Sequence, residues 1–362
     1  MNRLGSVAAA IVLLVASISI VLGLYRFTSF WMSPGPEPER YVFYEVKKKQ
    51  APLIIIRELA AQGIVRDPRI FYWYGRMTGK FSKFKAGDYR FSTAMTPDEV
   101  MNIIISGVSF GYPLTVPEGQ SMDQIAALLD KMRPGDGARF SRLCRDANYI
   151  KSLGTLVPEQ AKTLEGFLFP ETYLVTRKSP VEDLIRQMVS KYRAVFDEAA
   201  VARAKEMGFS EYKLVTLASV VERETGAPEE RPKVASVFHN RLKKRMKLQS
   251  DPTVIYGIKN YNGNITKKDL LTPHPWNTYT IPALPATPIG NPGKEALMAT
   301  LNPAETPFLY FVSHGDGTHE FTETYEKHNA AVQRFQVDRR AREGHSWREM
   351  SEKLGKTKGA KP

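Results

Sequence analysis

The sequence predicts an α+β protein with a single N-terminal transmembrane helix, a small β-α-α-β subdomain and a larger α+β domain. Three observations predict this organisation: an uncharged apolar run at the N-terminus, a strand–helix plan that occurs twice, and long helical patterns followed by a hairpin signature. The 362 residues suffice for about two or three domains. With 43% hydrophobic residues, the chain can bury a sizeable core.

The N-terminal run from Leu4 to Tyr25 carries no charge and lies between Arg3 and Arg26. A bilayer span takes about 20 apolar residues, whereas a signal peptide has an apolar region of about 7 to 15 residues before an A-x-A-like site. Because no such site follows Leu24, we expect a retained anchor over residues 4–26 behind a short cytoplasmic tail, residues 1–3. A short tail and one span most often leave the bulk of the chain outside the cytoplasm.

Composition limits the partners of the chain. Its one cysteine, Cys144, can form neither an intramolecular disulfide nor a thiolate metal cluster. The net charge of +13 suggests nucleic acid first, but a membrane anchor argues against that partner. Anionic lipid headgroups, an anionic wall polymer or an ordinary solvated surface remain as explanations. The six histidines show no metal-ligand spacing, so we expect no metal.

A proline-rich linker, residues 33–40, precedes a subdomain that we place at 41–112. Segments 43–65 and 112–132 share a plan of strand, short turn and amphipathic helix, although two ordinary β-α units would give the same pattern. Between them we expect a helix, a strand and a helix that Thr96 can cap, at residues 68–78, 86–92 and 97–106. Small β-α-α-β units of this kind occur in sugar-polymer binding modules.

The larger domain, residues 113–342, begins with helical patterns and ends with a hairpin. Helices are expected at 180–207, 210–225, 228–245 and 324–342. Loops rich in Pro, Gly, Asn and Thr fill 249–293, and strands at 308–313 and 318–323 flank the turn 314–317. The basic tail, residues 343–362, has little apolar periodicity, so we expect it to be disordered.

The segment "KLVTLASVVERETG", residues 213–226, predicts a buried helix with two carboxylates on its last turn. Ser210 is a suitable N-cap, Gly226 a suitable C′ residue, and the run between is apolar on nearly every face. Burial and the negative end of the helix dipole both raise the pKa of a carboxyl group there. A carboxylic acid that is partly protonated near neutral pH is what general acid catalysis needs.

Helical geometry separates the two glutamates. At about 100° per residue, Glu222 lies above Ala218 and Ser219, and Glu224 points about 200° away over larger apolar side chains. Small residues one turn back leave room for a ligand beside Glu222, which favours it as the acid. Two solvated glutamates at a helix end would show the same spacing.

Three further segments are typical of sugar binding because they combine aromatic rings with planar polar side chains. They are "LEGFLFPETY" (164–173), "LQSDPTVIYG" (248–257) and "WNTYTIPALPATPIGNPG" (276–293). The aromatic residues would equally suit a protein core, and Asp251-Pro252 is a common turn starter.

Five stretches resemble one family in order and spacing: "LASVVERET", "KVASVFHNRL", "LQSDPTVIYG", "NTYTIPALP" and "TPFLYFVSHGDGTHEF". Together they resemble the endolytic murein transglycosylases, or MltG/YceG-like proteins, from about residue 42 to 335. The layout is similar too, with an anchor, a LysM-like region and a catalytic domain. The resemblance implies a single-pass protein of the cell inner membrane with its bulk in the periplasm. It would cleave the MurNAc–GlcNAc β-1,4 bond of nascent peptidoglycan strands, leave 1,6-anhydro-MurNAc ends and so terminate elongation.

The resemblance also assigns roles. The first glutamate of "VERET", Glu222, would protonate the glycosidic oxygen and then take the proton of the sugar's own C6 hydroxyl. No cofactor is implied, and the implied partners are peptidoglycan glycan strands, the inner membrane through Leu4–Tyr25 and peptidoglycan synthases. The residues expected to bind the sugars are Gln249, Asp251, Thr253, Tyr256, Asn277, Tyr279 and Glu171.

Two alternatives remain open at this stage. A water-using muramidase would cut the same bond and leave a reducing end, and a non-catalytic peptidoglycan-binding scaffold would cut nothing. The substrate loop departs from the family pattern at Trp276, at Ala283 and at 285–287.

Overall fold

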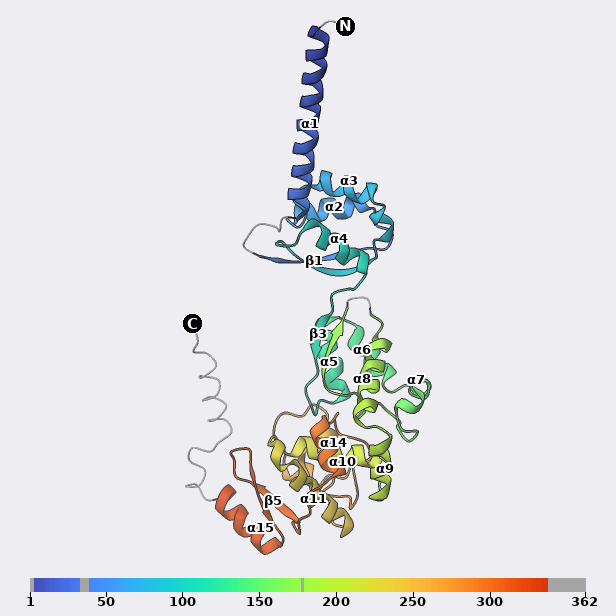
Figure 1. Ribbon diagram of the computed structural model, residues 1–362. Helices are drawn as coiled ribbons and strands as arrows, with labels where there is room; N and C mark the ends of the chain where they lie inside the picture. The colour runs from blue at the N-terminus through green and yellow to red at the C-terminus, as the bar shows by residue number, and fades with distance from the viewer. Residues whose placement is uncertain (1–2, 33–38, 177–178, 338–362) are drawn as a thin grey trace. The chain divides into compact units, whose positions relative to one another are not determined.

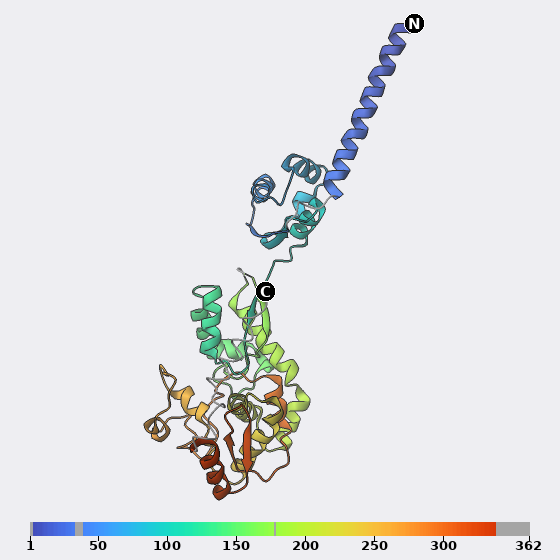
Figure 2. The same ribbon diagram turned by 90° about the vertical axis from the view of Figure 1, so that its left-hand side faces the viewer.

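The computed structural model describes residues 3–32, 39–176 and 179–337, with the backbone alone for 3–10 and Met32. The chain divides into two compact units, residues 1–112 with 174–178 and residues 113–173 with 179–362 (Figures 1 and 2). The mixed α+β composition agrees with the prediction. Most of the predicted linker, the first two residues and the basic tail 343–362 lie outside the described residues.

The N-terminal helix α1 (Arg3–Met32) contains a segment, Ile11–Trp31, that is long and apolar enough to cross a membrane. Its side chains from Ile11 to Arg26 are exposed. The helix continues past the predicted end at Arg26, because Phe27 and Trp31 pack against aromatic residues of the first unit. The assignment of α1 as a membrane span rests on the length and apolar composition of this segment.

The first unit has the predicted β-α-α-β order, and its elements are β1 (Tyr41–Val46), α2 (Pro52–Ala61), α3 (Pro68–Met77), β2 (Gly87–Ser92) and α4 (Pro97–Ser106). Strands β1 and β2 pair antiparallel, from Tyr41 opposite Ser92 to Val46 opposite Gly87. Thr96 and Glu99 form a capping box at the start of α4, which confirms the predicted cap. The LysM-like assignment stays a prediction.

The second unit is mainly helical and begins within strand β3, which pairs with β4. Its elements are β3 (Tyr112–Thr115), α5 (Met122–Met132), α6 (Asp136–Leu143), α7 (Ala147–Ser152), β4 (Thr172–Val175), α8 (Val181–Val195), α9 (Glu198–Glu206), α10 (Glu211–Glu224), α11 (Arg231–Lys243), α12 (Asp251–Gly257), α13 (Lys267–Leu271), α14 (Lys294–Leu301), β5 (Tyr310–Ser313), β6 (His319–Thr322) and α15 (Tyr325–Val332).

Helix α10 forms the centre of the second unit. It contacts α9, α11, α12 and α14 (Figure 1), and every residue from Leu214 to Val221 is buried, as the apolar pattern predicts. The Ser210 side chain accepts a hydrogen bond from the backbone N–H of Lys213, so the predicted N-cap is confirmed. The helix therefore holds its last turn in a fixed position.

Several predicted boundaries differ from the structure for local reasons. The pattern at 180–207 splits into α8 and α9, because the side chain of Asp197 caps a new helix. Helix α10 ends at an extended Thr225, and Gly226 does not take the left-handed C′ conformation. The presumed loops of 249–293 contain α12 and α13, and α14 was not predicted.

The C-terminal hairpin is confirmed. Strands β5 and β6 pair antiparallel from Tyr310 opposite Thr322 to Ser313 opposite His319. The last predicted helix forms as α15 and continues through a π-helical turn at Gln333–Val337. Its predicted remainder, 338–342, lies outside the described residues.

We expect Ser210→Ala to lower the free energy of unfolding by about 1 kcal/mol, because the N–H of Lys213 loses its acceptor. Urea unfolding followed by circular dichroism measures the loss. Ser210→Asp is the matched control, since aspartate also caps helices and should retain most of the stability. An equal loss in both variants would show that the cap does not support α10.

Candidate active site

The two glutamates at the end of α10 lie in different surroundings. Glu222 is enclosed by the loops that precede α5 and α14, with a side chain only 5% exposed. Glu224 lines a cleft of about 480 Å³. Glu222 is not among the residues that line this cleft in the described part of the chain. The helical offset predicted from sequence thus sends the two carboxylates to separate sites.

Glu222 has its charge compensated within the protein. Its Oε1 lies 3.0 Å from Nη2 of Arg231, whose side chain is 8% exposed, and its Oε2 accepts a 2.9 Å hydrogen bond from the N–H of Gly293. Burial raises the pKa of Glu222, and both contacts oppose that shift. The cation that offsets burial is Arg231, whereas Arg223 donates to the carbonyl of Ile289.

Protein backbone lies close to the small residue one turn before Glu222. The N–H of Ile289 donates to Oγ of Ser219, the small residue that was expected to leave room for a ligand. Backbone hydrogen bonds join Gly119 to Asn291 and Asn291 to Gln120, which brings two loops together over the helix end. A Cβ at Gly293 would overlap the carboxylate end of the Glu118 side chain, so a larger residue there would displace that side chain.

Glu224 combines burial with access to a ligand. Its Oε2 accepts a 2.8 Å hydrogen bond from Oγ of Ser250, and its remaining surface faces the cleft. Burial raises its pKa to about 7, and the negative charge of Asp251 adds to the shift. Ser250 and Arg241 act in the opposite direction. A carboxyl group in this state can donate a proton near neutral pH.

Polar and aromatic side chains from several parts of the second unit line the cleft. They include Glu224, Arg241, Gln249, Asp251, Tyr279, Tyr310, His319 and His328. A concave site with aromatic faces and planar hydrogen-bonding groups suits a carbohydrate chain. Three of the seven predicted sugar-binding residues, Gln249, Asp251 and Tyr279, therefore lie in one cleft with Glu224.

Arg241 fixes one wall of this cleft. Its guanidinium donates to the carbonyls of Leu248 and Leu309 and lies 3.3 Å from Oε1 of Gln249. Gln249 has a left-handed backbone with φ +52°, which is uncommon for a residue with a side chain. The structure thus holds Gln249 in a costly conformation that directs its amide toward the cleft.

Asp251 and Tyr279 form a second pair on the cleft wall. The hydroxyl of Tyr279 donates to Oδ1 of Asp251 at 2.6 Å. Asp251 is the first residue of α12, where a carboxylate is favoured by the helix dipole. The pair presents an aromatic face and a carboxylate together, a combination that binds sugar hydroxyls.

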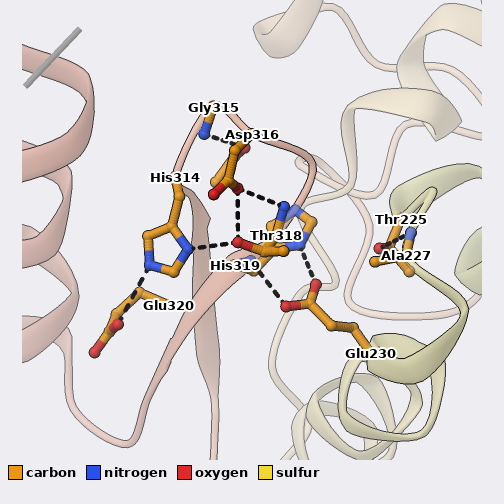
Figure 3. A network of polar contacts seen from close by, with 10 residues as sticks. Thr225, Ala227, Glu230, His314, Gly315, Asp316, Thr318, His319 and Glu320 are labelled. Carbon is orange, nitrogen blue, oxygen red and sulfur yellow. Dashed lines mark hydrogen bonds and ion pairs between the residues drawn. The ribbon is translucent and has the colours of Figure 1, made fainter. Parts of the chain in front are cut away.

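The hairpin also lines the cleft, through Tyr310 and through His319, which was not predicted as a site residue. Both Nδ1 and the backbone N–H of His319 contact the carboxylate of Glu230, at 2.7 and 3.0 Å (Figure 3). Glu230 immediately precedes Arg231, the partner of Glu222. At the turn, Asp316 and Thr318 hydrogen-bond each other, and Thr318 contacts His314 (Figure 3). Glu230 carried no local signal, since its partner His319 is 89 residues away, and the pairing of Arg231 with Glu222 crosses from one helix to the next.

The other four predicted sugar-binding residues lie outside the cleft lining. Thr253 is buried and contacts Ser250 and Thr278. Asn277 is buried and donates to three carbonyls at the end of α13. Tyr256 donates to Glu165, and Glu171 forms an exposed ion pair with Lys191. Thr253 and Asn277 support the cleft from behind, and Glu171 belongs to the β4 region.

A second buried carboxyl group, Glu165, was missed although its segment was singled out. It accepts hydrogen bonds from the N–H of Met122, the hydroxyl of Tyr256 and the amide of Asn291. Burial raises its pKa to about 7. Its three hydrogen-bonding neighbours all donate to it, and it is only 2% exposed. We therefore interpret Glu165 as a structural residue that links α5, α12 and the loop before α14.

We expect Arg231→Met to cost about 3 kcal/mol of stability, because it leaves the buried Glu222 carboxylate without its cation. Adding Glu222→Gln should recover part of the loss, and urea unfolding of the single and double variants measures the coupling. Purely additive losses would show that the pair is not coupled.

Comparisons with known proteins identify the family of the chain. The model of the YceG-like family matches residues 44–334. The endolytic murein transglycosylase of Bacillus subtilis (strain 168) is 32% identical over 290 residues, which cover 76% of this chain and 80% of that protein. The endolytic murein transglycosylase of Streptococcus pneumoniae serotype 2 is 26% identical over 304 residues, 76% of this chain and 54% of that protein.

A solved structure gives the same fold. The 2.6 Å crystal structure of a YceG-like protein from Listeria monocytogenes superposes with a TM-score of 0.57 at 29% identity. The match covers 80% of this chain and 98% of that one. Because the family match spans the first unit, the cleft and the hairpin, this chain belongs to the YceG-like family.

Proposed function

We propose that this chain is an endolytic murein transglycosylase that cleaves the β-1,4 bond between MurNAc and GlcNAc within peptidoglycan strands. The names of its relatives support this activity. The observation that carries the chemistry is Glu224, a carboxyl group with a pKa of about 7 that lines a polar and aromatic cleft. Such a group can protonate a glycosidic oxygen near neutral pH.

We further propose that Glu224, rather than the Glu222 favoured by the sequence, is the general acid. Glu222 is held by Arg231 and Gly293 and has the loop 289–293 over it. Glu224 has one hydroxyl donor, Ser250, and shares its cleft with three predicted sugar-binding residues. An acid must reach the bond that it protonates, and Glu224 lines the cleft that also holds these residues.

The reaction needs one carboxyl group that acts twice. Glu224 donates its proton to the glycosidic oxygen while an oxocarbenium-like centre forms at the MurNAc anomeric carbon. The resulting carboxylate then takes the proton of the C6 hydroxyl, whose oxygen bonds to the anomeric carbon and closes the 1,6-anhydro ring. Because the nucleophile belongs to the same sugar, its proximity replaces a bound water. Gln249 and the Asp251–Tyr279 pair would hold the sugars.

The cellular setting of the proposal follows from α1. With α1 as a membrane span that ends near Arg26, the protein would be a single-pass protein of the cell inner membrane with its bulk in the periplasm. There it would shorten nascent strands beside peptidoglycan synthases and terminate their elongation. The first unit, if LysM-like, would add a second contact to the glycan.

We expect Glu224→Gln to reduce the release of 1,6-anhydro-muropeptides from purified glycan at least about 100-fold, because the amide cannot donate the proton. Glu222→Gln, which keeps an acceptor for Arg231 and Gly293, should retain most of the activity. Mass spectrometry of the digests measures both. Loss of activity only in Glu222→Gln would return the acid role to Glu222.

The same digests separate the alternatives. A water-using muramidase would release products one water heavier than the anhydro ends. A scaffold protein would leave wild type and both variants equally inert. Either result would overturn the proposed reaction.

We expect kcat/KM to fall as pH rises through about 7. The pKa of Glu224 is raised, so its proton is present below that pH and lost above it. Asp251→Asn removes a negative charge that raises this pKa, so the fall should move to lower pH even if turnover drops. A pH profile measured on soluble glycan tests both points, and an unchanged limb in Asp251→Asn would show that another group titrates.

A further inference from the structure

We propose that α3 is an interfacial helix that lies in the headgroup region of the membrane beside α1. Its ligand is the bilayer surface: acyl chain ends for its apolar stripe and anionic headgroups for the neighbouring arginines. This inference rests on the membrane anchor in the proposed function, and it adds a second, separate contact of the first unit with lipid.

The apolar stripe of α3 consists of Ile70, Trp73, Tyr74 and Met77, which follow the i, i+3, i+4, i+7 spacing of one helix face. Trp73 is 61% exposed and Met77 is 82% exposed. The opposite face already fills the core of the first unit with Phe71 and Gly75. The stripe is therefore an additional surface rather than an unused part of the core.

A groove of about 600 Å³ connects this stripe to α1. Gly23, Arg26 and Phe27 of α1 line it together with Arg69 and the four stripe residues. Nearly all of its surface is apolar. An apolar groove that continues directly from a membrane-spanning helix has acyl chains as its natural occupant.

Aromatic contacts hold α3 against α1. The rings of Trp31 and Tyr74 have centroids 3.8 Å apart, and the rings of Phe27 and Tyr74 are 5.9 Å apart. A guanidinium N–H of Arg66 donates to the carbonyl of Phe30 at 3.3 Å. These contacts keep the stripe at the level of residues 23–31 of α1.

The arginines set the depth of the groove. The uncharged run of α1 ends at Arg26, and Arg26 and Arg69 both line the groove. A guanidinium is costly in hydrocarbon, so these side chains place the groove at the boundary between headgroups and acyl chains. Tryptophan and tyrosine are enriched at this boundary, and arginine is attracted to anionic lipid there. The side chains of α3 therefore suit the boundary between headgroups and acyl chains, which is the depth at which α1 places them.

The lone cysteine makes a site-specific test possible. Cys144 is buried, and burial raises the pKa of its thiol, so it reacts slowly with labelling reagents. We would introduce Met77→Cys on the stripe, Val108→Cys as a control of similar exposure (76%) in the same unit, and Val15→Cys within α1. Each full-length protein carries an environment-sensitive fluorophore and is reconstituted into vesicles of phosphatidylcholine and phosphatidylglycerol. Lipids with a quencher near the start of the acyl chain report contact.

The expected result is strong quenching at position 77, weak quenching at position 108, and quenching at position 15 by lipids labelled deep in the chain. Equal quenching at 77 and 108, with position 15 still in lipid, would overturn the α3 proposal and leave the anchor intact. Absence of quenching at position 15 would overturn the anchor and this inference with it.

Glycan digestion by the same labelled proteins tests the proposed activity separately, because no labelled position lies in the cleft.

The double variant Trp73→Glu with Met77→Glu provides a second check of the α3 proposal without a label. On quencher-free vesicles, α3 of this unlabelled variant should lose its lipid contact and be cleaved by protease faster than α3 of the wild type, and unchanged protection would count against the proposal.

Discussion

The burial of α10 from Leu214 to Val221 is the constraint on which the rest of the second unit depends. A helix that is apolar on every face must be covered on every face, and α9, α11, α12 and α14 supply the cover. Its charged residues are confined to its two ends, with Glu211 and Lys213 in the first turn and Glu222, Arg223 and Glu224 in the last. Because residues two positions apart point about 200° from each other, Glu222 and Glu224 emerge into separate surroundings.

The number of hydrogen-bond donors distinguishes the buried carboxyl groups. Glu222 has Arg231 and a backbone N–H, and Glu165 has a backbone N–H, a hydroxyl and an amide. Glu224 has one serine hydroxyl. Burial raises the pKa of both Glu165 and Glu224 to about 7, but the three donors of Glu165 hold it inside the protein, whereas Glu224 lines the cleft. Glu224 alone combines this state with the cleft.

Local signals in the sequence predicted local structure well. The caps at Ser210 and Thr96, the hairpin and the buried run of α10 all depend on residues close in sequence. The choice between the glutamates depended on what fills the space beside Ser219, and Ile289 fills it from 70 residues away. Likewise, Gln249, Asp251 and Tyr279 line the cleft. Asn277 and Thr253 instead form hydrogen bonds with other groups of the protein. Contacts between residues so far apart in the sequence leave no local sequence pattern from which they could be predicted.

The most direct test of the central claim is a crystal structure of the Glu224→Gln protein with a glycan strand bound. The account predicts that the strand lies in the cleft formed by Gln249, Asp251, Tyr279 and His319, with a MurNAc–GlcNAc glycosidic oxygen within hydrogen-bonding distance of the side chain at position 224. A strand bound elsewhere, with its glycosidic oxygen at Glu222 after the loop 289–293 has moved away, would contradict it.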